Sequence, residues 1–322
     1  MIRNGGRETL GQEETRQIVT VVGSINFDIL FKQSRLPLPG ETFEAEEVSF
    51  CGGGKGANQA VQIAKLGIPV YLAGAVGKDS LGEELIEKLK TYGVNTEYVL
   101  RSEENTGVGV VNFIHDGTLS ATISHGANYS ITTDHIDRLI PMIEKSWAVI
   151  FQLEIPVDVV RYGISRAAEA GCFVVLNASP IKALGRDTFA NVDCLVINEV
   201  EAAFYLGREI DDTNLVPLGM DLVKNTGKYL VITLGARGSV VFDGTDSRFI
   251  RALDVPVAET TGAGDSFIGT LTAMLMKGFD VREACSAATA ASSITVQKVG
   301  AQEAMPTIGM LQEAYPLHLH KG

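Results

Sequence analysis

Short, nearly continuous hydrophobic runs recur along the 322-residue chain, and each ends in glycine or a polar residue. Examples are VTVV at 19–22, VYLAGAVG at 70–77, AVIF at 148–151, CLVI at 194–197 and YLVIT at 229–233. Such runs are typical of strands buried on both faces. Most are separated by segments with helical spacing, such as 79–92, which we expect Asp79 or Ser80 to cap. The alternation predicts an α/β fold with a doubly wound, mainly parallel sheet flanked by helices.

Two segments break this alternation. Residues 28–50 contain Pro37, Pro39 and Gly40, and residues 107–126 alternate like a hairpin around a turn at 115–117. Together they predict a small second sheet that is too thin to bury a core of its own. We expect it to form a lid over the main sheet and to offer a face to a second subunit, giving a homodimer. The tails, 1–16 and 313–322, are expected to lie outside a single domain at 17–312.

Composition narrows the functional classes. The chain is 45% hydrophobic, which supplies a sizeable core, and its net charge of −12 argues against a nucleic-acid partner. No apolar run reaches the ~18 residues of a membrane span, and the polar start lacks a secretory h-region. The four cysteines form no CxxC pair, so the sequence indicates neither a zinc site nor a disulfide framework. We therefore expect a cytoplasmic protein with no membrane partner.

Polar residues and glycines follow several of the predicted strands. Ligands of doubly wound sheets bind outside the carboxyl ends of the strands. Ordinary loop chemistry could explain each residue alone, but several on one edge favour a site. These residues are Asn26, Glu154, Asn177, Asn198, Glu199 and Gly235.

The stretch TTGAGDSF at 260–267 precedes a strongly apolar helical segment. A helix N-terminus carries partial positive charge and unpaired N–H groups, and glycines let a ligand approach them. The stretch therefore predicts an anion site beside the carboxylate of Asp265. The alternative is that Asp265 only caps its own helix.

A second glycine-rich stretch, CGGGKGANQA at 51–60, has three interpretations. Gly52, Gly54 and Ala57 fit a dinucleotide-binding fingerprint, with Asp79 as the ribose acid, but the charged segment before them is a poor buried strand. A P-loop is excluded because Gly56 follows the lysine. A helix entry carrying Lys55 and Asn58 suits the hydroxyls of a polar ligand or a transferring phosphoryl group, whereas a flexible loop with a solvated lysine would carry no function.

Seven motifs occur in the order found in one family: GSINFD, PGE, GGGKGANQA, QLE, NEVE, TLGARG and TTGAGDSF. From about residue 17 to about residue 307 the chain resembles the phosphofructokinase-B-type, ribokinase-like sugar kinases. The resemblance implies a doubly wound α/β domain with a β-sheet lid that often forms a dimer interface. It also implies ATP-dependent phosphorylation of a sugar primary hydroxyl, with Mg²⁺ and K⁺ as cofactors and a small-molecule sugar as partner.

The resemblance assigns roles residue by residue. Asp265 corresponds to the catalytic base, and the backbone of Gly262, Ala263 and Gly264 to the anion hole. Asn198 and Glu201 correspond to the pair that organises Mg²⁺ through water, and Asn198 also to a nucleotide contact. The positions matching the sugar site are Asn26, Asp28, Gly54, Lys55, Asn58 and Glu154; those matching the nucleotide site are Thr233, Gly235 and Gly238; those matching the monovalent cation site are Glu259, Thr261, Thr295, Lys298 and Gly300.

Three departures from the family pattern stand out. Glu259 occupies a position where Asp is usual, and Ala304 replaces a residue that is often polar and near the potassium ion. Cys51 and Gly52 replace the usual residues before the first glycine signature. The departures at Glu259 and Ala304 leave open whether potassium activation survives.

The leading hypothesis for the acceptor is D-ribose, converted to ribose 5-phosphate. The alternatives are 2-deoxyribose, fructose, another small sugar or a nucleoside. Asn26 and Asp28 favour a small polyol, since two hydrogen-bonding groups so close together suit adjacent hydroxyls. Two other classes are a nicotinamide-dependent oxidoreductase and a sugar sensor on an inactive kinase scaffold. Lys55, Asp265 and the NxxE element argue against the sensor.

Overall fold

The computed structural model describes residues 16–114 and 119–315. Its main sheet has eight strands in the order β14-β13-β12-β11-β10-β9-β1-β4. Pairing is parallel from β4 to β12 and antiparallel for β13 and β14. This is the predicted mainly parallel sheet. Its strands are β1 (Ile18–Val22), β4 (Val70–Ala73), β9 (Ser146–Gln152), β10 (Phe173–Asn177), β11 (Cys194–Asn198), β12 (Tyr229–Thr233), β13 (Gly238–Phe242) and β14 (Ser247–Arg251).

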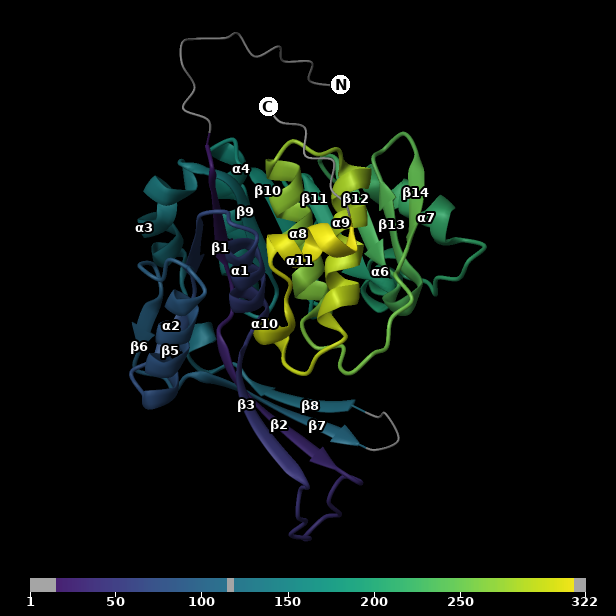
Figure 1. The fold of residues 1–322 in the computed structure, drawn as a ribbon. Coiled ribbons are helices and arrows are strands. Elements are labelled where there is room, and N and C mark those ends of the chain that lie inside the picture. The colour runs from purple at the N-terminus through teal and green to yellow at the C-terminus, as the bar shows by residue number, and fades with distance from the viewer. Residues whose placement is uncertain (1–15, 115–118, 316–322) are drawn as a thin grey trace.

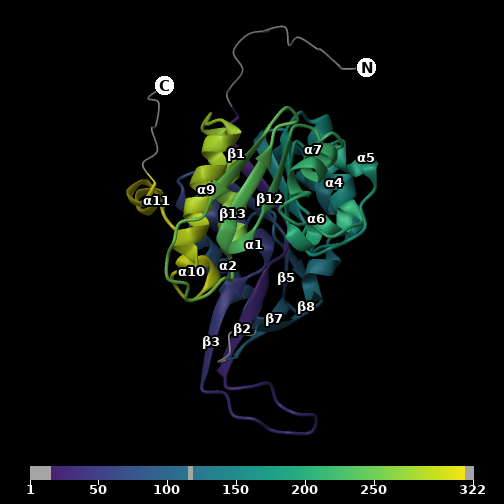
Figure 2. The same ribbon diagram turned by 90° about the vertical axis from the view of Figure 1, so that its right-hand side faces the viewer.

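Helices cover both faces of this sheet, as Figure 2 shows. One layer contains α1 (Lys55–Lys65), α8 (Ala263–Met276), α9 (Val281–Thr295), α10 (Ala301–Ala304) and α11 (Ile308–Ala314). The opposite layer, whose buried residues form a second hydrophobic cluster, contains α3 (Thr133–Ile143), α4 (Val157–Glu169), α5 (Arg186–Phe189), α6 (Glu199–Leu206) and α7 (Leu215–Val223). Within the described ranges, no helix combines the length and the apolar character needed to cross a membrane.

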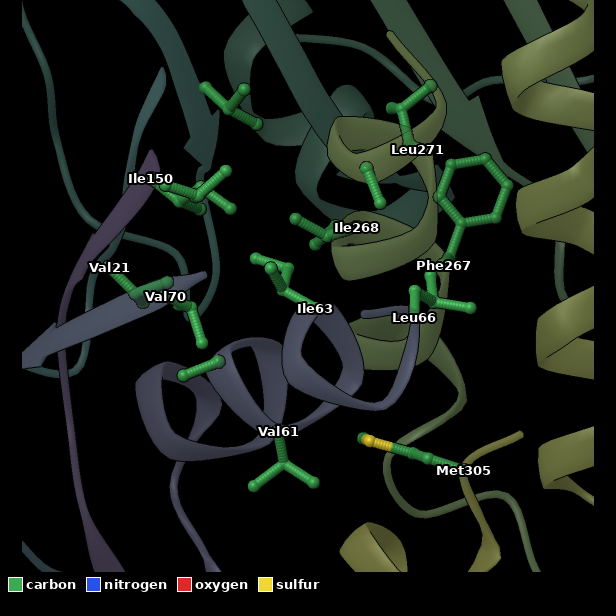
Figure 3. Close-up of a cluster of buried hydrophobic side chains, with 14 of the residues drawn as sticks. Val21, Val61, Ile63, Leu66, Val70, Ile150, Phe267, Ile268, Leu271 and Met305 are labelled. Carbon is green, nitrogen blue, oxygen red and sulfur yellow. The ribbon is translucent and has the colours of Figure 1, made fainter. Parts of the chain in front are cut away.

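The doubly buried strands explain the continuous hydrophobic runs. Successive side chains of β9 point to opposite faces, so Ile150 belongs to one hydrophobic cluster while Val149 and Phe151 belong to the other. Figure 3 shows the first cluster, in which Ile150 lies near Ile63 of α1 and Ile268 of α8. Packing against one sheet face thus fixes α1 and α8 beside each other.

A separate four-stranded sheet projects from the body (Figure 1). Its order is β3-β2-β7-β8, formed by β3 (Glu47–Gly53), β2 (Asn26–Gln33), β7 (Gly107–Ile114) and β8 (Leu119–Ser124). The predicted small sheet is therefore present, and β7 pairs antiparallel with β8. The expected turn at 115–117 and most of both predicted tails lie outside the described residues.

One predicted strand differs from the structure. The segment 70–77 forms two strands in different sheets, β4 and β5 (Ala75–Gly77), and β5 pairs with β6 (Leu100–Ser102). The break falls at Gly74, where a Cβ atom would lie 2.7 Å from the carbonyl oxygen of Gly23. Because only glycine permits this approach, the chain can turn there and leave the main sheet. The predicted cap of the next helix, α2 (Ser80–Thr91), is Asp79, which accepts a hydrogen bond from Gly82 N–H.

Candidate active site

Two helix N-termini meet where the main sheet faces the small one. Lys55 is the first residue of α1, and Asp265 lies in the first turn of α8. Asp265 accepts a hydrogen bond from Asn58 Nδ2 at its Oδ2 atom and one from Gln59 Nε2 at its Oδ1 atom, each 2.9 Å long. The structure therefore joins the two glycine-rich stretches, although more than two hundred positions separate Asn58 from Asp265. The N-cap of α8 is Gly262, and no side chain caps it. The carboxylate of Asp265 thus hydrogen-bonds to α1 and does not cap its own helix.

Burial dominates the electrostatics of Asp265. The residue is 6% exposed, and desolvation raises the pKa of its carboxyl above the usual range. Lys55, Asn58 and Gln59 oppose that shift because they favour the ionised form. Burial alone would lower the pKa of Lys55, but the carboxylates of Asp265, Glu154 and Glu201 outweigh it and raise that pKa. The lysine is therefore positively charged, beside an acid that could take up a proton.

Glu154 follows β9 and ties the first helix to the sheet edge. Its Oε2 atom accepts hydrogen bonds from Ser24 Oγ at 2.5 Å and from Lys55 N–H at 3.1 Å. The residue is only 6% exposed. Its carboxylate thus fixes the entry of α1 and still adds negative charge next to Lys55.

Asn26 and Asp28 lie on β2, where the small sheet leaves the body. Asn26 Oδ1 accepts a hydrogen bond of 2.7 Å from Asn128 Nδ2. Asp28 fits between two glycines: Cβ atoms at Gly53 and Gly109 would lie 1.9 and 2.4 Å from its carboxylate oxygens. Burial, followed by the negative charges of nearby acids, raises the pKa of Asp28 to about 6. The two glycines therefore leave space for the carboxyl group of Asp28, while burial and the nearby acids disfavour its ionised form.

The glycine-rich start of α8 opens into a cavity of about 770 Å³. Gly262 has a φ of 78°, and nothing lies within 4 Å of a Cβ atom built at Gly264. Ala263 and Gly264 line this cavity together with Thr233, Gly235 and Gly238. The cavity has room for a large ligand whose anionic end would meet the exposed N–H groups.

Asn198 and Glu201 form a reciprocal cap at the start of α6. Asn198 Oδ1 accepts a hydrogen bond from Glu201 N–H, and Glu201 Oε2 accepts one from Asn198 N–H, each 2.9 Å long. Glu201 also influences the residues around Asp265, because its negative charge raises the pKa of Lys55. Glu199, also singled out at a strand end, instead pairs with Arg237 at the surface.

Glu259 is buried next to the loop before α10. Its Oε2 atom accepts a 2.8 Å hydrogen bond from Gly300 N–H. Within residues 16–114 and 119–315, its Oε1 atom is buried without a hydrogen-bond partner. Thr295 Oγ1 is already engaged, with Ser266 Oγ and the carbonyl of Ala291. A buried carboxylate oxygen that lacks a donor is a place where a cation fits.

Sequence reasoning missed several side chains at this site. Gln59, Gln152, Asn128 and Gln302 are all buried and hydrogen-bond to predicted site residues or to each other. Gln59 could have been found, because it follows Asn58 within the glycine-rich stretch. Gln152, Asn128 and Gln302 come from three distant segments, and no local pattern marks them. Asn177, noted only as a strand-end residue, accepts a hydrogen bond from Gln59 Nε2 at 3.4 Å.

Known proteins resemble this chain over nearly its whole length. The ribokinase of Haemophilus influenzae is 32% identical over 294 residues, covering 91% of this chain and 96% of that protein. The deoxyribokinase of Salmonella typhimurium is 29% identical over 303 residues, covering 93% and 99%. The solved structure of Arabidopsis thaliana ribokinase, complexed with ribose and ATP, matches with a TM-score of 0.84 at 30% identity, covering 93% and 98%. The model of the pfkB family carbohydrate kinases matches residues 16–308, and the chain belongs to this family.

Proposed function

We propose that this enzyme transfers the γ-phosphoryl group of ATP to the 5-hydroxyl of D-ribose, yielding ribose 5-phosphate and ADP. The observation that carries the proposal is the position of Asp265, a buried carboxylate beside both Lys55 and a glycine-rich helix start. The relatives named ribokinase and the neighbour solved with ribose and ATP support the choice of substrates.

In this mechanism Asp265 removes the proton from the attacking sugar hydroxyl, which is otherwise a poor nucleophile. The backbone N–H groups of Gly262, Ala263 and Gly264 stabilise the negative charge that develops on the transferring phosphoryl group. The positive charge of Lys55 offsets the nearby acids Asp265 and Glu154. The rest of the nucleotide occupies the cavity lined by Thr233, Gly235 and Gly238.

The sugar binds on the other side of Asp265. We assign its hydroxyl contacts to Asn26, Asp28, Glu154 and the helix entry at Gly54 and Lys55. The two β2 side chains can hold neighbouring hydroxyls, because residues 26 and 28 alternate to the same face of a strand. Both polar ends of Asn58 are engaged by protein groups, so any sugar contact of Asn58 would use its remaining hydrogen-bonding capacity.

Two cations fit the residues present. Asn198 and Glu201 would hold Mg²⁺ through its waters, since Glu201 keeps its Oε1 atom outside the reciprocal cap and Asn198 Oδ1 keeps a second lone pair to accept from a metal-bound water. When bound, Mg²⁺ offsets the charge of the nucleotide phosphates. Glu259 would hold K⁺ together with the carbonyls of Thr261, Thr295, Lys298 and Gly300. The unpartnered Oε1 atom of Glu259 supports this site, although Ala304 supplies no side-chain oxygen.

A second candidate acceptor is 2-deoxyribose, because a relative of similar identity is a deoxyribokinase. A coupled ADP-release assay across pentoses, hexoses and nucleosides discriminates the candidates, with phosphorus NMR identifying the product. We expect ribose to have the highest kcat/KM of the panel. No ATP turnover with any sugar would reject the kinase assignment, and a preference for deoxyribose would reject ribose alone.

We also propose that the small sheet is a lid and the dimer interface. The face of this sheet opposite Asp28 carries Ile29, Phe31, Val48, Phe50 and Val110, which are neighbours in the strand register. Phe50 is 60% exposed and Val48 is 46% exposed, an apolar pair that a second copy would cover. Sedimentation equilibrium is expected to give a dimer for the wild type and a monomer for Phe50→Asp. A monomeric wild type would reject this interface.

A further inference from the structure

Each oxygen of the Asp265 carboxylate accepts a hydrogen bond from one side-chain amide. Each of these two amides in turn accepts a hydrogen bond from a second side-chain amide. Gln302 Nε2 donates to Asn58 Oδ1 at 3.1 Å, and Asn58 Nδ2 donates to Asp265. Gln152 Nε2 donates to Gln59 Oε1 at 2.7 Å, and Gln59 Nε2 donates to Asp265. All four amides are at most 4% exposed. We call Asn58 and Gln59 the inner amides and Gln302 and Gln152 the outer amides.

The direction of these hydrogen bonds follows from chemistry. An ionised carboxylate can only accept, so each inner amide must turn its NH₂ group toward Asp265. A side-chain amide has nearly the same shape when rotated by half a turn, so its packing alone does not select that orientation. An outer amide that presents NH₂ to the carbonyl end of the inner amide does select it. The reversed orientation would place two NH₂ groups together at one end and two oxygens together at the other.

We propose that Gln302 and Gln152 are positioning residues for Asp265, which fix the orientation of Asn58 and Gln59 and thereby hold the carboxylate ionised and in place. This inference rests on the proposed role of Asp265 as the base. Burial raises the pKa of Asp265, while its bonds to Asn58 and Gln59 lower it. The outer amides act through the inner ones, which are the side chains that donate hydrogen bonds to the carboxylate within the described ranges.

The backbone around the outer amides leaves room for them. A Cβ atom at Gly23 would lie 1.8 Å from Gln152 Oε1, and one at Gly52 would lie 2.7 Å from Gln302 Oε1. In the described part of the chain, Gln152 Oε1 is buried without a hydrogen-bond partner. An unpaired buried oxygen is costly, so a role in stability alone explains Gln152 poorly. Its NH₂ group, in contrast, has a clear use at Gln59.

The test compares Gln302→Met, which removes the donor, with Gln302→Glu, which offers only acceptors and would turn the NH₂ group of Asn58 away from Asp265. The matched controls are Gln62→Met and Gln62→Glu. Gln62 is a fully buried glutamine on the same helix as Asn58, and its amide contacts Pro306 and Ser266 instead of Asp265. Single-turnover rates of phosphoryl transfer are measured from pH 5 to 9 with saturating ATP and the best sugar of the panel.

We expect the rate to fall about 10-fold in Gln302→Met and about 100-fold in Gln302→Glu, the range that corresponds to a hydrogen bond to a charged group. Sugar KM should change less than about threefold, since the sugar contacts remain. In Gln302→Glu, the acidic limb of the plot of rate against pH should move up by about one pH unit, because Asp265 loses a hydrogen bond that favours its charged form. In both Gln62 variants this limb should stay in place, because Asp265 keeps its hydrogen bonds.

Several outcomes would overturn the inference. One is an unshifted acidic limb in an active Gln302→Glu; another is a limb that moves equally in Gln62→Glu, which would indicate a charge effect only. Thermal unfolding identifies variants that do not fold, and Gln152→Met and Gln152→Glu then provide the same test through Gln59. A wild type without turnover on any sugar would reject the proposed function. If the wild type is active and the Gln302 and Gln152 variants keep its rate and its pH dependence, only the positioning role is rejected.

Discussion

Replacing Asp28 with Asn should stabilise the free enzyme while impairing it. In the folded protein the pKa of Asp28 rises from 3.8 to about 6, chiefly through burial and then through Glu154, Asp265 and Glu259. Asn has nearly the same shape, so it fits between Gly53 and Gly109 and can still accept the backbone hydrogen bond from Gly109. The substitution thus removes a charge that burial and the neighbouring acids oppose.

The magnitude follows from proton linkage. Because the folded pKa is the higher one, the folded state binds the proton more tightly, and the stability contributed by this proton is lost as pH rises from about 4 to about 6. The pKa of Asp28 rises by about two pH units, and each corresponds to about 1.36 kcal/mol. Ionised Asp28 therefore lowers the free energy of unfolding by about 3 kcal/mol above pH 7. The same linkage leaves a cost of about 1 kcal/mol at pH 4.5. The Asp28→Asn variant should avoid both costs.

The assay is urea unfolding without ligands at pH 8 and pH 4.5. We expect Asp28→Asn to be more stable by up to about 3 kcal/mol at pH 8 and by about 1 kcal/mol at pH 4.5. Asp158→Asn, an exposed change on α4, is the control and should stay within about 0.5 kcal/mol at both. Sugar KM should rise about 10- to 100-fold in Asp28→Asn, because a charged acceptor is lost. No gain at pH 8, or equal gains at both pH values, would refute the electrostatic reasoning.

Four further outcomes follow from the site. Asp265→Asn should lower turnover by ~10²–10⁴-fold with sugar binding kept, and retention of more than about a tenth of the rate would contradict its role as base. Gly109→Ala should raise ribose KM, since its Cβ atom would lie 2.4 Å from Asp28 Oδ1, whereas Gly309→Ala, with its nearest contact 4.0 Å away, should not. Ribose should exceed 2-deoxyribose in kcat/KM by about 10-fold or more, because the shorter set of hydroxyls leaves a buried polar group unpaired. Potassium should activate the enzyme at a lower concentration in Glu259→Asp than in the wild type, measured as kcat against KCl with tetramethylammonium balancing ionic strength; identical titrations would remove Glu259 from the cation site.

The sequence predicts those parts of the structure that depend on local patterns. Strands buried on both faces produce continuous runs, which is why β9, β11 and β12 could be recognised. The glycine stretches before α1 and α8 predict helix starts that a ligand can approach. The bend at Gly74 was not predictable, because the close approach that requires glycine there is to the carbonyl of Gly23, which is distant in the sequence. Gln152 and Gln302 were missed for the same physical reason: their importance lies in contacts between segments.

The negative charge of the site affects which forms of its ligands can bind. The negative charges of Glu154, Asp265 and Glu259 raise the pKa of Asp28, and Glu154 also raises that of Asp265. Glu154 and Asp265 in turn raise the pKa of Lys55. One lysine does not balance these four acids, three of which are buried, so the site disfavours further negative charge. ATP adds several negative charges next to them, whereas a sugar adds none and brings hydroxyl donors to the carboxylates. The negative charge of the site therefore favours a nucleotide whose phosphate charge Mg²⁺ has already offset, and it would also favour the cation that we propose at Glu259.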